Sequence, residues 1–415
     1  MININLIREN PELVRSGMEK KLANPELVDK FLKIDSEWKS LKKTVDDARA
    51  AQKSLGPDKR EEARKLKEEI AGNDEKIAIL SEERDFIVSQ IPNLPEDSVP
   101  EGKDDSENVV LKAVGEPRKF PFKPKDYVDL AGERIDTERA SKIAGSRFGY
   151  IMGDIAEMDF ALFRLGMDTL LPYGFRLTLP PVMLKPEILR RMGKGKFIDA
   201  GDAFYVSEDD LYLVGSSEQS IAPMFADETV SVGKPLRFLG FSTCFRREAG
   251  SYGKDTRGIL RVHQFNKLEM FVICRPENSK EEHEFLLARQ EELMQKLGLP
   301  YRVVVNSTGD MGFDASKQYD VEAWLPSQEK YRETHSCSNT TDFQARGLNI
   351  TYKTAGNPPA GGKKEFVHTL NATAFSERPL LAILENFQRE DGSVEVPESL
   401  RKYMGKDEIL LSDGQ

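Results

Sequence analysis

The sequence predicts an α+β fold, in which an N-terminal arm of two antiparallel helices precedes a globular domain that contains β-strands. Three observations predict it. Apolar residues recur in heptads over residues 26–91, a dense globular composition begins at Val128, and apolar and polar side chains alternate over residues 259–273. We therefore expect an N-terminal domain at residues 1–100, a polar linker at 101–126 and a second domain at 127–415.

The heptad region is predicted to form a coiled-coil hairpin, because its apolar positions are spaced alternately by three and four residues. Gly56 and Pro57 end the first helix, so the second should fold back antiparallel to it. Asn73 and Arg84 interrupt the apolar seam of the second helix. The seam positions of the first helix are Phe31, Ile34, Trp38, Leu41, Val45, Ala48, Gln52 and Leu55.

The arm differs in charge from the rest of the chain. The whole chain has 60 basic and 70 acidic residues and a formal net charge of −10. This balance argues against bulk electrostatic attraction to nucleic acid, so any RNA contact must come from a local basic patch. Residues 39–67 carry a net charge of +5. That charge fits an ordinary solvated coiled-coil surface as well as an RNA-binding arm.

Cysteine usage and hydropathy indicate the compartment. The three cysteines, Cys244, Cys274 and Cys337, show no CxxC spacing, which argues against a disulfide framework and a cysteine-rich zinc site. The first residues contain no apolar signal core, and no stretch of about 18 apolar residues occurs anywhere. We therefore expect a soluble cytoplasmic protein that is not inserted in a membrane.

Residues 241–274 concentrate convergent polar chemistry. Arg246 and Glu248 precede a glycine-rich loop that contains Lys254 and Arg257. The strand predicted at 259–273 has Leu268 on its core face and places Arg261, His263, Phe265, Lys267, Glu269 and Phe271 on the other face. The ring of Phe265, the carboxylate of Glu269 and the cations around them suit the binding of a nucleoside triphosphate and an amine. The alternative interpretation is an antiparallel strand that has one face in contact with solvent and binds nothing.

Three other stretches bring polar groups into otherwise apolar surroundings. Residues 211–218, LYLVGSSE, end in a small polar turn, which read alone is only a turn. Residues 331–338, YRETHSCS, crowd polar groups into a strand, where a hard cation would satisfy carboxylate and hydroxyl oxygens together. Residues 371–387, NATAFSERPLLAILENF, begin an apolar helix at Arg378, which either binds an anion or faces solvent.

These stretches resemble the motifs of one family. Residues 245–269, FRREAGSYGKDTRGILRVHQFNKLE, closely resemble motif 2 of class II aminoacyl-tRNA synthetases in its seryl-tRNA synthetase form. The helix at 151–171 with the strand at 175–179 resembles motif 1, the dimer interface of the family, and residues 371–387 resemble motif 3. The resemblance covers nearly the whole chain and implies the antiparallel β-sheet of a class II catalytic domain behind a tRNA-binding arm. It also implies serine–tRNA ligase activity.

The resemblance also assigns roles to residues. Arg246 and Arg378 would be catalytic, with Arg246 bridging the serine carboxylate and the α-phosphate of ATP. Mg²⁺ on the nucleotide would be held by Glu333 and Ser336. The residues implied in ATP binding are Arg246, Glu248, Arg261, Phe265, Glu333, Ser336 and Arg378. Those implied in serine binding are Ser216, Glu218, Arg246, Glu269, Asn371 and Thr373.

The implied partners are ATP, L-serine, tRNA(Ser) with tRNA(Sec) as a further candidate, and a second copy of the chain. The arm would grip the long variable arm of the tRNA, and the loop with Lys254 and Arg257 would lie near its acceptor stem. The chain departs from the family pattern in three places. Ser216 replaces a threonine, Glu377 replaces a glycine in a loop one residue shorter than usual, and residues 46–48 lack the usual basic stretch.

Two alternatives remain at this point. One is a synthetase-like paralogue that loads a carrier protein, which should lack the arm. The other is a catalytically altered RNA-binding or regulatory paralogue, in which the motif arginines should be lost. Both Arg246 and Arg378 are present.

Overall fold

The computed structural model describes the chain except residues 57, 251–252, 254, 256, 355–361 and 411–415. The described residues form two compact units, Met1–Leu94 and Pro95–Gln415, each of which has its own packing. No described helix has both the length and the apolar character that a membrane span requires.

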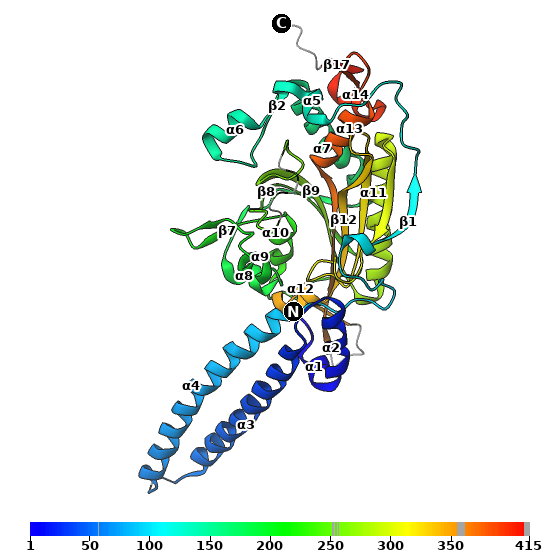
Figure 1. Cartoon of the computed structure of the whole chain (residues 1–415). Helices are drawn as coiled ribbons and strands as arrows, with labels where there is room; N and C mark the ends of the chain where they lie inside the picture. The colour runs from blue at the N-terminus through cyan, green and yellow to red at the C-terminus, as the bar shows by residue number, and fades with distance from the viewer. Residues whose placement is uncertain (57, 251–252, 254, 256, 355–361, 411–415) are drawn as a thin grey trace. The chain divides into compact units, whose positions relative to one another are not determined.

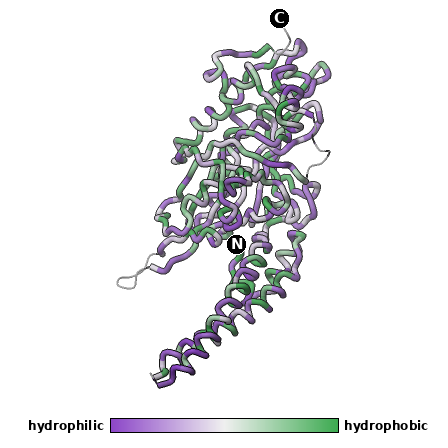
Figure 2. Tube along the Cα trace, turned by 90° about the vertical axis from the view of Figure 1, so that its left-hand side faces the viewer, coloured by the Kyte–Doolittle hydropathy of each residue, from purple (hydrophilic) through white to green (hydrophobic). Residues whose placement is uncertain are grey.

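The first unit contains the predicted hairpin (Figure 1). Two short helices, α1 (Ile4–Glu9) and α2 (Pro11–Lys20), precede the long helices α3 (Glu26–Ser54) and α4 (Arg60–Gln90). The long helices are antiparallel, since Arg49 binds Asp74 at 2.8 Å and Gln52 donates to the backbone oxygen of Ala63 at 3.2 Å. Figure 2 shows apolar positions interspersed with hydrophilic ones along these helices, as a coiled-coil seam requires.

A buried ion cluster occupies the base of the hairpin. Arg84, which the sequence marks as an interruption of the seam, is 7% exposed and binds Asp35 at 3.0 Å. Asp35 also binds Arg8 at 2.7 Å and Lys39 at 3.0 Å. The guanidinium of Arg84 lies 4.2 Å from the ring centroid of Trp38. Burial alone would raise the pKa of Asp35, but its bonds to Arg8 and Lys39 and the nearby charge of Arg84 lower it to about 2.

The pairing of the helices changes the charge of the arm. Because α3 and α4 are antiparallel, residues 68–80 of α4 lie alongside the half of α3 that begins at Lys39. Including these residues lowers the net charge from +5 to +2. The basic excess predicted from residues 39–67 is therefore smaller in the folded arm.

The second unit is organised by an eight-stranded sheet in the order β1-β10-β11-β12-β15-β9-β8-β4. Neighbouring strands are antiparallel except β4 and β8, which are parallel, so the predicted antiparallel sheet is confirmed. The strands are β1 (Val109–Val114), β4 (Arg176–Thr178), β8 (Leu236–Phe245), β9 (Gln264–Cys274), β10 (Tyr301–Val305), β11 (Lys317–Leu325), β12 (Lys330–Thr341) and β15 (His368–Ser376).

Helices cover both faces of this sheet (Figure 1). One core contains Leu268 and Met270 of β9 together with residues of α7 (Gly153–Leu170), α11 (Ser279–Leu297) and α13 (Arg378–Asn386). The other contains Phe271 and Ile273 together with residues of α8 (Pro186–Arg191), α10 (Glu218–Ile221) and α12 (Phe343–Leu348). Both faces of β9 are therefore buried, which excludes the solvated strand considered from the sequence.

The remaining elements are short. The other helices are α5 (Tyr127–Ala131), α6 (Thr137–Ala144), α9 (Gly195–Asp199) and α14 (Glu398–Met404). The small antiparallel sheets pair β2 (Ile135–Asp136) with β3 (Tyr150–Ile151), β13 (Thr351–Lys353) with β14 (Lys364–Phe366), and β16 (Ser393–Glu395) with β17 (Glu408–Leu410). A three-stranded sheet joins β5 (Met183–Leu184), β7 (Leu211–Leu213) and β6 (Tyr205–Val206).

The structure differs from the sequence prediction at two places. The stretch 101–126 is not only a linker, because it contains β1, which pairs with β10 at the edge of the main sheet. The central strand begins at Gln264, not at residue 259. The backbone N–H groups of Ile259 and Leu260 donate to the hydroxyl of Tyr127 at 3.0 and 3.2 Å, so they are not available to a neighbouring strand.

Candidate active site

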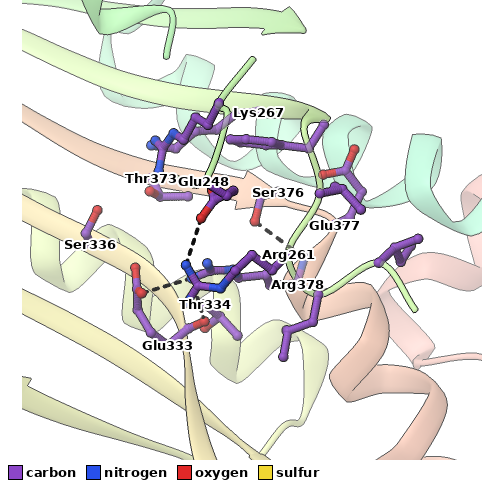
Figure 3. Close-up of a pocket in the computed structure, with 15 residues that line it drawn as sticks. Glu248, Arg261, Lys267, Glu333, Thr334, Ser336, Thr373, Ser376, Glu377 and Arg378 are labelled. Atoms are coloured by element: carbon purple, nitrogen blue, oxygen red, sulfur yellow. Dashed lines mark hydrogen bonds and ion pairs between the residues drawn. The ribbon is translucent and has the colours of Figure 1, made fainter. Parts of the chain in front are cut away.

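A polar pocket is lined by the segment between β8 and β9 and by residues of β9, β12, β15 and the start of α13 (Figure 3). Eight of the residues predicted from the sequence line it: Arg246, Glu248, Arg261, Phe265, Glu333, Ser336, Thr373 and Arg378. They come from three segments of the chain, residues 246–265, 333–336 and 373–378. The folding of one antiparallel sheet therefore brings together side chains that the sequence presents in three separate motifs.

Arg246 lies directly after β8 and is held by the polar turn that precedes α10. Its Nε donates to the backbone oxygen of Gly215 at 3.1 Å, and its backbone N–H donates to that of His263 at 3.0 Å. A Cβ at Gly215 would lie 2.9 Å from the ring of Phe197, so any larger residue here would have to displace that ring. The guanidinium carbon lies 5.3 Å from the ring centroid of Phe265. Arg246 is thus fixed between the turn and an aromatic ring.

Glu248 and Arg261 bind one another. Arg261 Nη1 donates to Glu248 Oε2 at 2.8 Å, and Glu248 adopts a left-handed backbone conformation with φ of 54°. Arg257 binds Asp126 at 2.7 Å and also Asp129, both at the start of α5. The predicted role of Arg257 near an acceptor stem stays a prediction, and Lys254 lies outside the described residues.

Glu333 and Arg378 form an ion pair across the pocket (Figure 3). Arg378 Nη1 lies 2.9 Å from Glu333 Oε2 and donates to the Glu333 backbone oxygen at 3.1 Å. The charge of Arg378 lowers the pKa of Glu333, which keeps its carboxylate ionised. Ser336 follows on the same strand and lines the same pocket. A carboxylate and a hydroxyl oxygen fit a hard divalent cation whose other ligands are phosphate oxygens and water.

A second polar cluster is buried beside the pocket. Glu218 begins α10, and its Oε1 accepts from Gln344 Nε2 at 2.6 Å and from Asn371 Nδ2 at 3.3 Å. Ser216 Oγ accepts from the Glu218 backbone N–H at 3.4 Å. Three of the residues predicted to bind serine are therefore brought together, although none of them is among the residues that line the pocket.

Glu269 is the most buried of the predicted residues. It pairs in register with Thr373 on β15 and is 0% exposed. Burial raises its pKa, and the ion pair with Lys267 opposes that shift. Lys267 itself lines the pocket, so the buried carboxylate of Glu269 is paired with a cation at the pocket wall. The alternation of the strand places Lys267 and Glu269 on one face, but nothing in the sequence shows that the two side chains bind each other.

The side chain of Glu377 is hydrogen-bonded to strand β9 of the main sheet. It precedes Arg378, and its Oε1 accepts from the backbone N–H of Asn266 at 2.6 Å. Burial and the charge of Asp159 on α7 raise its pKa to about 8. Burial also raises the pKa of Asp159 to about 7. Glu377 and Asp159 thus form a buried acidic pair beside the pocket, which the sequence pattern alone does not reveal.

The chain matches two family models. Residues 1–95 match the model described as the seryl-tRNA synthetase N-terminal domain. Residues 204–387 match the tRNA synthetase class II core domain (G, H, P, S and T).

Similar proteins cover the full length of the chain. A serine–tRNA ligase of Dictyoglomus turgidum is 41% identical over 426 residues, which cover 99% of each chain. One of Thermobifida fusca is 42% identical over 424 residues, which cover 98% of each. The crystal structure of seryl-tRNA synthetase from Pyrococcus horikoshii complexed with ATP superposes with a TM-score of 0.91 at 39% identity and covers 99% of each chain.

Proposed function

The chain belongs to the seryl-tRNA synthetase family: it is a class II aminoacyl-tRNA synthetase and a serine–tRNA ligase, and we infer from the geometry how its residues divide the reaction. The single observation that supports the assignment is the convergence of Arg246, Glu333 and Arg378 on one pocket. The retained arginines and the full-length match to serine–tRNA ligases disfavour an altered RNA-binding paralogue. The arm disfavours a carrier-loading paralogue.

In the first step the serine carboxylate attacks the α-phosphate of ATP, and pyrophosphate leaves. The nucleophile is already ionised, so the residues need to supply charge and position rather than a general base. We propose that Arg246 neutralises the carboxylate and the α-phosphate and that Arg378 receives the far end of the triphosphate. Phe265 would stack on adenine, with Glu248 and Arg261 beside it. For this to happen, Arg378 must exchange part of its bond with Glu333 for phosphate.

The ion pair between Glu333 and Arg378 also affects the proposed binding of Mg²⁺. We propose that Glu333 and Ser336 hold Mg²⁺ on the nucleotide, since both residues line the pocket and carry oxygen ligands. The ion would neutralise phosphate charge as pyrophosphate departs. The carboxylate of Glu333 keeps the charge that this role requires, because Arg378 lowers its pKa.

We propose that serine binds as a zwitterion between Arg246 and Glu218. The turn at Gly215 supports this arrangement, because it accepts a bond from Arg246 and leads directly to Glu218. Glu269 and Thr373 would bind the serine hydroxyl. Alanine would leave these buried polar groups unpaired and should be rejected strongly, whereas an extra methyl group, as in threonine, is worth only about 1–3 kcal/mol.

In the second step the terminal ribose hydroxyl of tRNA attacks the adenylate. We propose that residues 1–100 form the tRNA-binding domain and residues 127–415 the catalytic domain. The arm would contact the phosphates of a long variable arm, through basic residues that have no acidic partner within the described arm. tRNA(Sec) is included in the proposal as a second substrate, to be tested beside tRNA(Ser).

We also propose a homodimer through α7 and the strand that follows it. Phe160 on α7 is 68% exposed, Leu177 on β4 is 46% exposed and Leu179 just after β4 is 76% exposed. Large apolar side chains gathered at such exposure mark an interaction surface.

The three buried free cysteines fit the reducing cytoplasm that we propose as the location.

The proposal is tested by amino-acid-dependent exchange between ATP and pyrophosphate. We expect exchange with serine, much weaker exchange with threonine and cysteine, and none above background with alanine. Exchange that does not depend on serine would contradict the assignment of the pocket.

A further inference from the structure

The pocket lies where two neighbouring strands of the main sheet stop pairing. The pairing between β12 and β15 ends with Cys337 opposite Ala372. Within the described residues of both strands, it does not continue to the next two residues, Ser336 and Thr373. Both of these residues line the pocket. The end of the backbone ladder therefore coincides with the wall of the pocket.

Each strand also has an irregularity at this point. The pairing of β12 with β11 skips Thr334, and the pairing of β15 with β9 skips Ala374. A bulge of this kind bends the strand and interrupts its ladder of hydrogen bonds. Buried backbone oxygens near the two bulges therefore need donors from other parts of the chain.

Gln290 on α11 supplies two of these donors. It is fully buried, and its Nε2 donates to the backbone oxygens of Ser336 and Thr373, both at 2.8 Å. The amide nitrogen has two hydrogens, so one side chain joins the two strands just beyond the end of their ladder. The reverse orientation would place the amide oxygen against two carbonyl oxygens, so the amide is fixed as it stands.

His335 supplies a third donor. It is fully buried on β12, and its Nε2 lies 3.0 Å from the backbone oxygen of Ala374. A carbonyl oxygen only accepts, so Nε2 carries the hydrogen. Burial lowers the pKa of His335 to about 4, so the ring is neutral above that pH and this is its one N–H. The Nδ1 atom lies 2.8 Å from the hydroxyl oxygen of Thr334, so the ring lies between the two bulges.

The roles proposed for Ser336 and Thr373 require a fixed spacing between them. Ser336 would hold Mg²⁺ on the nucleotide, and Thr373 would bind the hydroxyl of serine. In a regular sheet the ladder fixes the distance between neighbouring strands. Here the ladder has ended, and the bonds from Gln290 and His335 connect the two strands instead.

We propose that Gln290 and His335 are positioning residues, which replace the missing ladder bonds and hold Ser336 and Thr373 at the spacing that the metal and the serine hydroxyl require. This inference rests on the proposed roles of Ser336 and Thr373. Neither Gln290 nor His335 lines the pocket, so both act through the backbone of residues that do. Loss of the Gln290 amide should therefore disturb the binding of the metal and of the hydroxyl together.

The test uses the full-length chain and two analogues of the aminoacyl-adenylate in which a sulfamate replaces the phosphate. One analogue carries serine and the other alanine, so the ratio of their Kd values without added metal measures the contact with the serine hydroxyl. Gln290→Met keeps nearly the same shape but has no donor. It should reduce the preference for the seryl analogue on the order of tenfold. The concentration of Mg²⁺ for half-maximal serine-dependent exchange should also rise on the order of tenfold.

Asn386 on α13 provides the matched control. Its buried Nδ2 also donates to two backbone oxygens, those of Trp324 and Ala382, both at 2.8 Å, and none of these three residues lines the pocket. Asn386→Leu should lower the melting temperature much as Gln290→Met does, but leave the analogue preference and the Mg²⁺ requirement unchanged. A Gln290→Met variant that loses stability and changes neither quantity would overturn the proposal in favour of a merely structural role.

If Gln290→Met does not fold, two variants of His335 decide. His335→Gln keeps an N–H that can reach the backbone oxygen of Ala374, whereas His335→Leu has none. The first should keep the native preference for the seryl analogue within about threefold, and the second should lose it on the order of tenfold. Equal preferences in the two variants would refute the positioning role.

Thr373→Val separates this inference from the function on which it rests. If Thr373→Val leaves the preference for the seryl analogue unchanged, Thr373 does not bind the hydroxyl, and the assignment of the serine site is wrong. If Thr373→Val reduces that preference but Gln290→Met does not, only the positioning role is wrong.

Discussion

Shortening the arm should separate the two steps of the reaction. Deleting residues 36–84 would be a poor experiment, because it removes Arg84 and Lys39 from the buried carboxylate of Asp35. The pKa of Asp35 is lowered from 3.8 to about 2. This shift corresponds to about 2 kcal/mol of stability, present above pH 4 and lost as the pH falls towards 2. Deleting residues 42–77 and joining Leu41 to Ala78 through a short Gly-Ser loop keeps this cluster.

The size of the effect follows from the charges that are removed. Ten basic residues lie within 42–77. Arg49, Lys59, Arg64 and Lys65 are engaged in ion pairs, which leaves six basic residues with no acidic partner among the described residues. At about 0.5 kcal/mol for each exposed contact with a phosphate, six contacts give about 3 kcal/mol. Charging at limiting tRNA should therefore fall on the order of 100-fold.

The assay compares pyrophosphate exchange with charging of tRNA(Ser) and tRNA(Sec) transcripts at one fixed ionic strength. Exchange should stay within about twofold of the native rate, because the pocket lies wholly in the second unit. Hydrogen exchange over α3 and α4 shows whether the shortened hairpin is folded. Undiminished charging by a folded, shortened chain would refute the role of the arm.

Three further predictions concern the second unit. Phe265→Ala should raise the KM for ATP on the order of tenfold, since stacking on a base is worth about 1–3 kcal/mol, and leave the KM for serine little changed. Glu377→Gln should raise the melting temperature more at pH 8 than at pH 6: burial and Asp159 raise the pKa of Glu377 to about 8, so the native chain loses stability as the pH rises towards that value. A gain in melting temperature that does not depend on pH would contradict the raised pKa of Glu377. That raised pKa corresponds to a difference in stability of at least about 1 kcal/mol. Phe160→Lys with Leu179→Lys should convert the proposed dimer to monomers in sedimentation velocity at micromolar concentration, and unchanged sedimentation would contradict the proposed interface.

The sequence predicts those features that depend on local periodicity or on contiguous motifs. The heptads of α3 and α4 predict the hairpin, because the apolar seam recurs at regular spacing and its positions are buried or half-buried in the folded arm. Three stretches predict eight residues of the pocket: the motif around Arg246, residues 331–338 and residues 371–387. Neighbouring strands carry these residues to one place.

Features that depend on pairing between distant segments could not be predicted. Glu218 meets Lys194 and Gln344 only because α8, α10 and α12 pack on one face of the sheet. The start of β9 at Gln264 depends on the hydroxyl of Tyr127, which is 132 residues before Ile259. The hydrophilic surroundings of β1 hide a strand that is defined by its partner β10.

The folded charge of the arm also depends on pairing. Residues 39–67 are contiguous, but the surface that they share includes acidic residues of α4 beyond Lys67. A window along the chain therefore overstates the positive charge that a nucleic acid would meet. Only the antiparallel register shows which residues lie alongside each other.

The central claim is that Arg246 neutralises the carboxylate and the α-phosphate as they approach. Serine-dependent pyrophosphate exchange by Arg246→Ala, at saturating ATP and serine, tests it most directly. Removing a charged group that acts mainly in the transition state should lower kcat by at least about 10²–10³-fold, while the melting temperature stays near the native value. Exchange within about tenfold of the native rate by the folded variant would show that the reaction does not depend on this guanidinium.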